Sequence, residues 1–193
     1  MRFNFNTHKT LNGLHAPFSP SQPSWLRYTD ERAVVVFRNK KAAERGTKLH
    51  AWAKDTIDLG IKQAESNKTL NMYINDAIGF KMKTEVVLYY SDRFFGTADT
   101  ISFRKNPATG RMILRIHDLK TGTTPASIEQ LEIYAALFCL EYKIRPGEID
   151  IELRLYQKDQ VLVHIPTVEQ ISKIMDHIMH LNKIIEKLED EEG

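Results

Sequence analysis

The sequence of 193 residues is poor in cysteine and has no long apolar run. The single cysteine, Cys139, excludes an internal disulfide framework, a zinc knuckle and a four-cysteine iron–sulfur cluster, because each of these needs more than one cysteine. No apolar run approaches the ~20 residues that span a bilayer. The opening residues, MRFNFNTHKT, lack the apolar segment of a secretory signal. We therefore expect a cytoplasmic protein that has no membrane partner.

The sequence also lacks a large excess of charge of one sign, since the net charge is only +2. The charged residues are nevertheless unevenly spread along the chain. Residues 1–60 hold ten Lys and Arg against five Asp and Glu, a net of +5, whereas residues 167–193 hold three against seven, a net of −4. A basic N-terminal third can face a polyanion or can simply be a solvated surface. Charge alone does not separate these two interpretations.

The order of patterns along the chain indicates an α/β fold. Residues 1–38, rich in Asn, Pro and Ser near their start, read as an N-terminal lead-in, and residues 39–193 as a single globular domain. Helical spacing predicts helices over residues 41–62, 70–78, 125–142 and 167–188, the third one capped by Thr124 and opened by Pro125. Strand patterns cover residues 85–90, 94–104, 111–119, 149–156 and 161–165. Strands on both sides of a helix predict a mixed β-sheet core flanked by helices.

Three ionisable residues interrupt apolar rows on these strands. Side chains alternate across a strand, so Asp118 and Lys120 continue the row of Leu114 and Ile116. Asp99 falls in the same way on a row with Ile101, Phe103, Phe95 and Thr97. Buried charges are paired or bind metal, and an ion pair between Asp118 and Lys120 would leave Asp99 without a partner. Two carboxylates aimed at one point suit Mg²⁺ or Mn²⁺.

Two further residues fit such a site. His50, on the small-residue face of the helix over 41–62, can add a nitrogen ligand. Lys120 beside the carboxylates can orient a nucleophile and stabilise developing negative charge. The structural alternatives are that Asp99 sits at a strand edge and that His50 is a core histidine, and these explain each residue taken singly better than they explain the set.

Four short motifs resemble the RecB-type branch of the PD-(D/E)xK nucleases: G-x-x-x-H at 46–50, G-T-A-D at 96–99, D-L-K-T-G at 118–122 and Q-L-E-I-Y at 130–134. Glu85 also fits the layout of that family, and Ser19-Pro20-Ser21 resembles its opening motif more loosely. The likeness covers about residues 40–142. Each motif is weak by itself, and their order and spacing carry the resemblance.

The resemblance implies a restriction-endonuclease-like fold and a role for each motif residue. Asp99 and Asp118 would bind one or two Mg²⁺ or Mn²⁺ ions, with His50 and the backbone carbonyl of Leu119 as further ligands. Lys120 would position or activate the attacking water, and Asp99, Asp118 and Lys120 would form the catalytic set. The substrate-binding or supporting residues would be Gln130, Tyr134, Glu85 and Ser21. Simple helix packing is the competing interpretation for Tyr134.

The same resemblance implies a stand-alone, metal-dependent DNA exonuclease of recombination or repair, similar to phage-type exonucleases. The chain has no G-x-x-x-x-G-K-[ST] motif of a helicase and no iron–sulfur cluster. The expected partners are DNA, a single-strand annealing protein and further copies of the chain, in a prokaryotic or phage-infected cell. One alternative is an endonuclease on the same fold. Another is a catalytically silent DNA-binding or assembly protein.

Overall fold

A computed structural model of the protein describes residues 16–192, and the chain forms two compact units with the boundary between Thr47 and Lys48. The first unit contains the short helix η2 (Pro23–Arg27) and the start of α1 (Asp30–Asp58). In it the Trp25 indole N–H donates to the Ser19 carbonyl over 2.9 Å, and the Trp25 ring packs against Phe18. None of the helices in the described range is long and apolar enough to cross a lipid bilayer.

Helix α1 begins earlier and ends earlier than its predicted bounds of 41–62. The missed start signal is Thr29, whose side-chain oxygen accepts the Arg32 N–H at 3.3 Å and whose carbonyl accepts the Ala33 N–H at 2.9 Å. Acidic Asp30 and Glu31 follow in the first turn, where the helix dipole favours negative charge. At the other end Gly60 takes a positive φ of 67°, and the Ile61 N–H bonds back to Thr56 over 3.0 Å, which stops the helix.

The second unit is built on a five-stranded mixed sheet of order β1-β2-β3-β4-β5. Its strands are β1 (Lys83–Ser91), β2 (Phe94–Lys105), β3 (Met112–Leu119), β4 (Asp150–Gln157) and β5 (Gln160–His164). Strands β3 and β4 pair in parallel and all other neighbours are antiparallel. The parallel pair requires a crossover, which α3 (Glu129–Tyr142) supplies. The sequence-based prediction of an α/β fold with a mixed sheet flanked by helices is confirmed.

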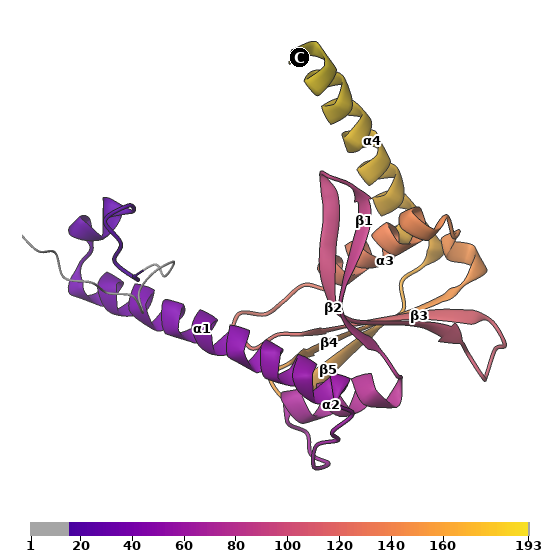
Figure 1. The fold of residues 1–193 in the computed structure, drawn as a ribbon, viewed down its shortest axis with the longest axis horizontal. Helices are drawn as coiled ribbons and strands as arrows, with labels where there is room; N and C mark the ends of the chain where they lie inside the picture. Colours follow the sequence, from indigo (N-terminus) through magenta and orange to yellow (C-terminus); the bar gives the residue numbers. More distant parts are fainter. Residues whose placement is uncertain (1–15, 193) are drawn as a thin grey trace, which may run out of the picture. The chain divides into compact units, whose positions relative to one another are not determined.

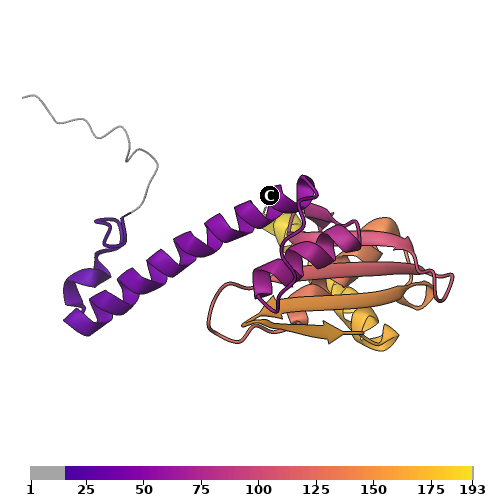
Figure 2. The same ribbon diagram turned by 90° about the horizontal axis from the view of Figure 1, so that it is seen from below.

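Helices cover both faces of this sheet, as Figure 1 shows for α3 on one side and α2 on the other. The first face packs Leu88, Ala98, Leu114, Ile116 and Leu153 under α3, with α4 (Val168–Glu192) outside it. On the other face, α2 (Thr69–Gly79) and the last turns of α1 lie over Leu119 and Tyr156, and Figure 2, turned by 90° from Figure 1, shows these helices against the strands. Both faces of β3 are therefore buried, and the sequence-based picture of one apolar row was incomplete.

Helix α3 begins at Glu129, not at Pro125, so the predicted Thr124 cap is wrong. The reason is Gln157 of β4, whose amide donates to the Gly122 carbonyl at 2.9 Å and the Thr124 carbonyl at 2.7 Å. The same side chain accepts the Ala126 N–H at 3.1 Å. These bonds hold residues 122–126 as an extended connection, and helical turns begin only beyond it.

The alternation of side chains between the two faces of the sheet is interrupted within the paired region of β1 and β2. Glu85 has a positive φ of 48°, rare for a residue with a side chain, and the strand register passes from Thr84↔Thr100 to Val86↔Ala98 without pairing Glu85 with Asp99. As a result Ala98 is buried in the same cluster as Ile101 and Phe103, whereas Phe95 and Thr97 are exposed. The predicted continuous row through Asp99 is therefore wrong: Asp99 sits where the alternation breaks.

Candidate functional site

The predicted site residues of the second unit converge where the end of β3 lies beside the middle of β2. Asp99 comes from β2, Asp118 from β3, Lys120 from the residue after β3 ends, and His50 from α1. The Leu119 backbone N–H donates to Asp99 Oδ2 over 3.0 Å, and His50 Nδ1 lies 3.4 Å from the same oxygen. The structure thus brings together residues that lie up to 70 positions apart in the sequence, counting from 50 to 120.

Asp118 is buried and poorly compensated. Lys120 Nζ donates to Asp118 Oδ1 over 3.2 Å and lies 3.0 Å from Oδ2 without the geometry of a hydrogen bond, so Oδ2 is buried with no hydrogen-bond donor. Burial raises the pKa of Asp118 to about 6, and the negative charge of Asp99 adds to this effect while Lys120 opposes it. Such a carboxylate is stabilised by any additional cation that reaches it.

Side chains of α3 also hold Lys120 in place. Lys120 Nζ donates to Gln130 Oε1 over 2.8 Å, and Gln130 Nε2 donates to the Tyr134 hydroxyl over 3.2 Å. Tyr134 in turn lies against Gly96, where an added Cβ would come within 2.9 Å of its ring carbon Cε1. The glycine of G-T-A-D therefore leaves room for the tyrosine of Q-L-E-I-Y, which ties two of the motifs together. An open groove lined by Gly96, Lys120, Gln130 and Tyr134 runs beside this line.

Tyr73 of α2 is a residue of this region that the sequence did not reveal. Burial raises the pKa of its phenol, and the negative charges of Asp99, Asp118 and Glu85 raise it further. The three carboxylates thus act on one buried group. No local motif marks Tyr73, because its place depends on how α2 packs on the sheet.

The remaining predicted residues have different surroundings. Glu85 is exposed, in the strained backbone position opposite Asp99. Ser21 belongs to the first unit, where its Oγ lies 2.8 Å from Ser19 Oγ, and its supporting role stays a prediction. Leu119 lies at the end of β3 between Asp118 and Lys120, and the role of its carbonyl stays a prediction too.

The side chains are of the types that bind a hard divalent cation, but their arrangement is not that of a complete metal-binding site. Among the residues that the structure describes, no three His, Cys, Asp or Glu side chains surround one point closely enough to hold a metal ion. The ammonium of Lys120 lies against Asp118, where it offsets part of the missing charge. The two carboxylates, the unpaired Asp118 Oδ2 and the nearby imidazole are nevertheless donors that Mg²⁺ and Mn²⁺ accept.

Comparisons with protein-family models, with curated proteins and with solved structures found no match to this chain.

Proposed function

We propose that the protein is a divalent-metal-dependent deoxyribonuclease of the RecB-type PD-(D/E)xK kind, with a restriction-endonuclease-like fold, acting as an exonuclease in DNA recombination or repair. The observation that carries the proposal is the buried Asp118 carboxylate, which faces a second carboxylate and keeps one oxygen without a donor. Lys120 Nζ lies 3.0 Å from this oxygen and offsets part of its charge, but no hydrogen-bond donor among the described residues reaches it. Groups kept in such a state are typical of sites that bind something else.

Asp99 and Asp118 would hold the cation, with His50 and the Leu119 carbonyl as further ligands. When bound, a divalent cation polarises a phosphodiester and lowers the pKa of a water molecule. Asp99 is oriented by the Leu119 N–H and Asp118 by the rigid end of β3, so both carboxylates are preorganised. Hydrolysis adds water across a P–O bond, leaving a phosphate on one product and a hydroxyl on the other, and needs no oxidant.

Lys120 would stabilise the negative charge that develops on the phosphate. Its ammonium is half-buried and held between Asp118 and Gln130, so it can move over a short distance toward a substrate without losing all its partners. Gln130 orients Lys120, and Tyr134 orients Gln130. Exposed cations on α1, among them Lys41, Arg45 and Lys48, give the chain a surface that suits a polyanion.

The test is digestion of DNA by the purified full-length protein with Mg²⁺ or Mn²⁺. End-labelled linear duplexes and single strands should be shortened while closed circles remain intact, and Lys120→Met should remove the activity. Lys173→Met, at an exposed Lys of α4, is the matched control and should retain it. Cutting of closed circles would assign an endonuclease. Absence of cleavage with either metal would instead favour a catalytically silent DNA-binding protein, for which the Lys120–Asp118 pair would be a permanent substitute for the cation.

A further inference from the structure

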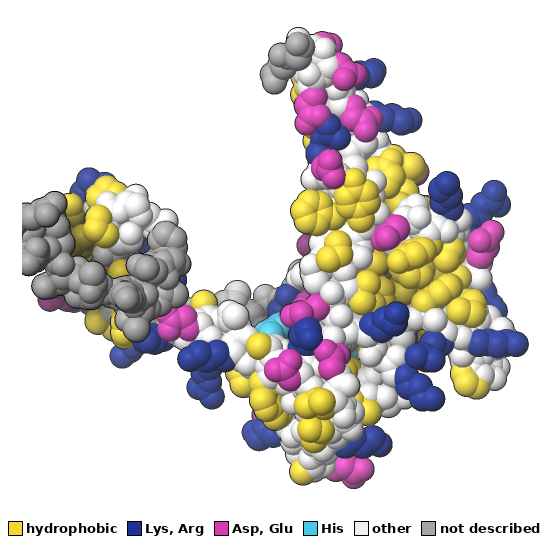
Figure 3. All heavy atoms as spheres, viewed as in Figure 1, with side chains coloured by type: hydrophobic (Ala, Val, Ile, Leu, Met, Phe, Trp, Pro, Cys, Tyr) yellow, Lys and Arg dark blue, Asp and Glu magenta, His cyan; other side chains and the backbone are white. Residues whose placement is uncertain are grey.

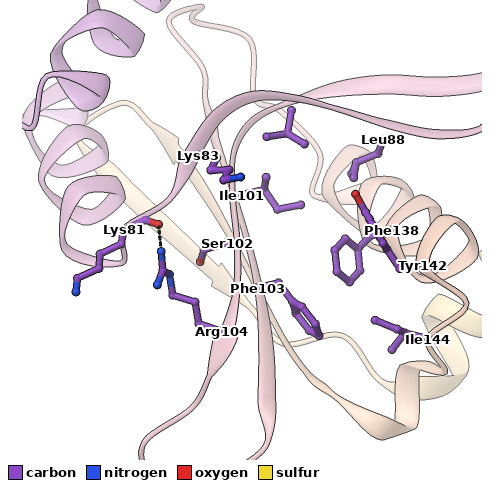
Figure 4. Close-up of a pocket in the computed structure, with 11 residues that line it drawn as sticks. Lys81, Lys83, Leu88, Ile101, Ser102, Phe103, Arg104, Phe138, Tyr142 and Ile144 are labelled. Atoms are coloured by element: carbon purple, nitrogen blue, oxygen red, sulfur yellow. Dashed lines mark hydrogen bonds between the residues drawn. The ribbon is translucent and has the colours of Figure 1, made fainter.

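An apolar hollow lies on the α3 face of the sheet, beside the start of β1 at Lys83, where β2 continues past β1 and pairs only with β3. Figure 4 shows its side chains, with the aromatic rings gathered on one side. The apolar lining comprises Val86, Leu88, Ile101, Phe103, Phe138 and Tyr142. The hollow forms because the side-chain alternation of β1 and β2 is interrupted at Glu85 and Asp99. Apolar residues from both sides of the interruption therefore lie on the same face of the sheet.

The rim of this hollow is cationic. Lys81, Lys83 and Arg104 line it, and none of its lining residues, all within the described range, is acidic. Arg104 Nη2 donates to the Lys81 carbonyl over 3.2 Å, which holds the guanidinium at the rim (Figure 4). An apolar floor with a basic border fits a segment that carries both apolar side chains and carboxylates.

The C-terminal end of α4 has this complementary chemistry. Ile184 and Leu188, four residues apart and thus on one helix face, are 42% and 52% exposed. Asp190 and Glu191 follow as exposed acids, and Figure 3 shows Asp and Glu side chains along this end of the helix. Residues 183–193 carry two Lys against five Asp and Glu, a net of −3.

The C-terminal end of α4 extends away from the sheet (Figure 1), and it cannot reach the basic rim of the hollow of its own chain. Asn182 of α4 is anchored at the far end of β1, where its Oδ1 accepts the Ser91 hydroxyl over 2.7 Å. Lys83 lies eight strand residues away, about 27 Å along β1. The ten helical residues after Asn182 extend only about 15 Å. Arg93 further holds α4 at the β1–β2 turn through Glu186 and Glu189.

We infer that the acidic end of α4 (residues 184–192) of one copy docks into the basic-rimmed hollow of a second copy. The two surfaces are different places on one chain, so the contact is head-to-tail and leaves a free hollow and a free helix end on every pair. Repetition closes into a ring or continues as an open chain. One short helix end forms the contact, so we expect the assembly to be reversible.

The experiment is sedimentation velocity of the full-length protein over a concentration series. The wild type should assemble reversibly and less strongly at high salt. Lys83→Glu at the rim and Leu188→Glu on the helix should each raise the dissociation constant at least tenfold. Both positions are exposed, so the variants should fold. Lys173→Glu, remote from both surfaces on the first turns of α4, is the charge-matched control.

Mixing the two variants separates this proposal from every other mode of assembly. The Lys83→Glu protein retains an intact helix end, and the Leu188→Glu protein an intact hollow, so together they should form a 1:1 dimer that grows no further. A combined Lys83→Glu and Asp190→Lys protein should recover part of its self-association. A monomeric wild type, or assembly that neither variant weakens, would overturn the proposal. So would weaker binding of a single-stranded oligonucleotide by Lys83→Glu with no change in assembly, which would make the hollow a nucleic-acid site.

Discussion

Two carboxylate clusters lie on the second unit, one around the partly exposed Asp76 and one around the buried Asp118, and they differ in how completely their charges are compensated. On the α2 face, Asp76 Oδ2 accepts from Arg154 Nη1 at 2.8 Å and from the Tyr156 hydroxyl at 2.6 Å. At the end of β3, Asp118 faces another carboxylate and keeps an oxygen without a donor. The carboxylate of the first cluster accepts two hydrogen bonds on one oxygen, whereas Asp118 has only the Lys120 ammonium beside it within the described range.

The two clusters differ in how their charged groups are paired. Around Asp76, Tyr156 also lies 3.2 Å from His117 Nδ1, and Arg154 and Arg115 share Glu152. Burial, with the charges of Arg154 and Arg115, lowers the pKa of His117 well below its usual range, so the imidazole stays neutral. Each charged group there has a partner of opposite charge, although Nε2 of the neutral His117 imidazole is buried without a hydrogen-bond partner in the described part of the chain. At Asp118, by contrast, Lys120 offsets only part of the effect of burial and of the Asp99 charge, and carboxylates with a raised pKa tend to coincide with function.

The largest expected effect separates the two clusters by activity. Asp118→Asn and Lys120→Met should lower the cleavage rate by about a thousandfold or more, because they remove a cation ligand and the ammonium that stabilises charge. Asp76→Asn should leave the rate per folded molecule nearly unchanged. Single-turnover cleavage of a labelled linear duplex measures all three. Equal losses in Asp76→Asn and Asp118→Asn would mean that the clusters do not differ in role.

The second prediction concerns stability and the Asp76 cluster. Asp76→Asn replaces a charge-assisted bond to Arg154 with a neutral one and should lower the free energy of unfolding by about 1 to 2 kcal/mol. Urea denaturation followed by circular dichroism measures this change. The Asp118 cluster should respond in the opposite direction to the same substitution.

That opposite response is the third prediction, for Asp118→Asn without divalent metal. The pKa of Asp118 is raised from 3.8 to about 6 in the folded protein, so between these values the folded state binds more protons than the unfolded state. Stability is therefore fully present below pH ~4 and is lost as the pH rises to ~6. At neutral pH Asp118→Asn should raise the free energy of unfolding by about 1 to 3 kcal/mol. The gain should disappear near pH 4, and a constant gain at all pH values would contradict the account.

The smallest expected effect tests the link between Gly96 and Tyr134. Gly96→Ala places a methyl group 2.9 Å from the Tyr134 ring, so the ring must shift and Gln130 must lose its contact with the tyrosine hydroxyl. The turnover number should fall about three- to tenfold with little change in KM, because Lys120 is held less firmly. Gly79→Ala, where an added Cβ meets nothing within 4 Å, is the control.

Much of the sheet could be predicted from the sequence, because strand patterns and turn residues are local signals. Asp118 and Lys120 could be placed together for the same reason, since both lie on one strand end. The position of Asp99 depended on an interruption of the side-chain alternation at Glu85 that needs a positive φ, and no propensity rule anticipates that. The start of α3 depended on Gln157, which lies 28 residues beyond Glu129, and Tyr73 depended on the packing of α2.

The central claim is that the Asp118 cluster is a cation site, and calorimetric titration with Mn²⁺ at neutral pH tests it most directly. The account predicts saturable binding by the wild type and by Asp76→Asn, and at least tenfold weaker binding by Asp118→Asn. Lys120→Met should bind as tightly as the wild type or more tightly, because the ammonium and the cation compete for one carboxylate. Absence of binding by the wild type, or equal binding by Asp118→Asn, would contradict it.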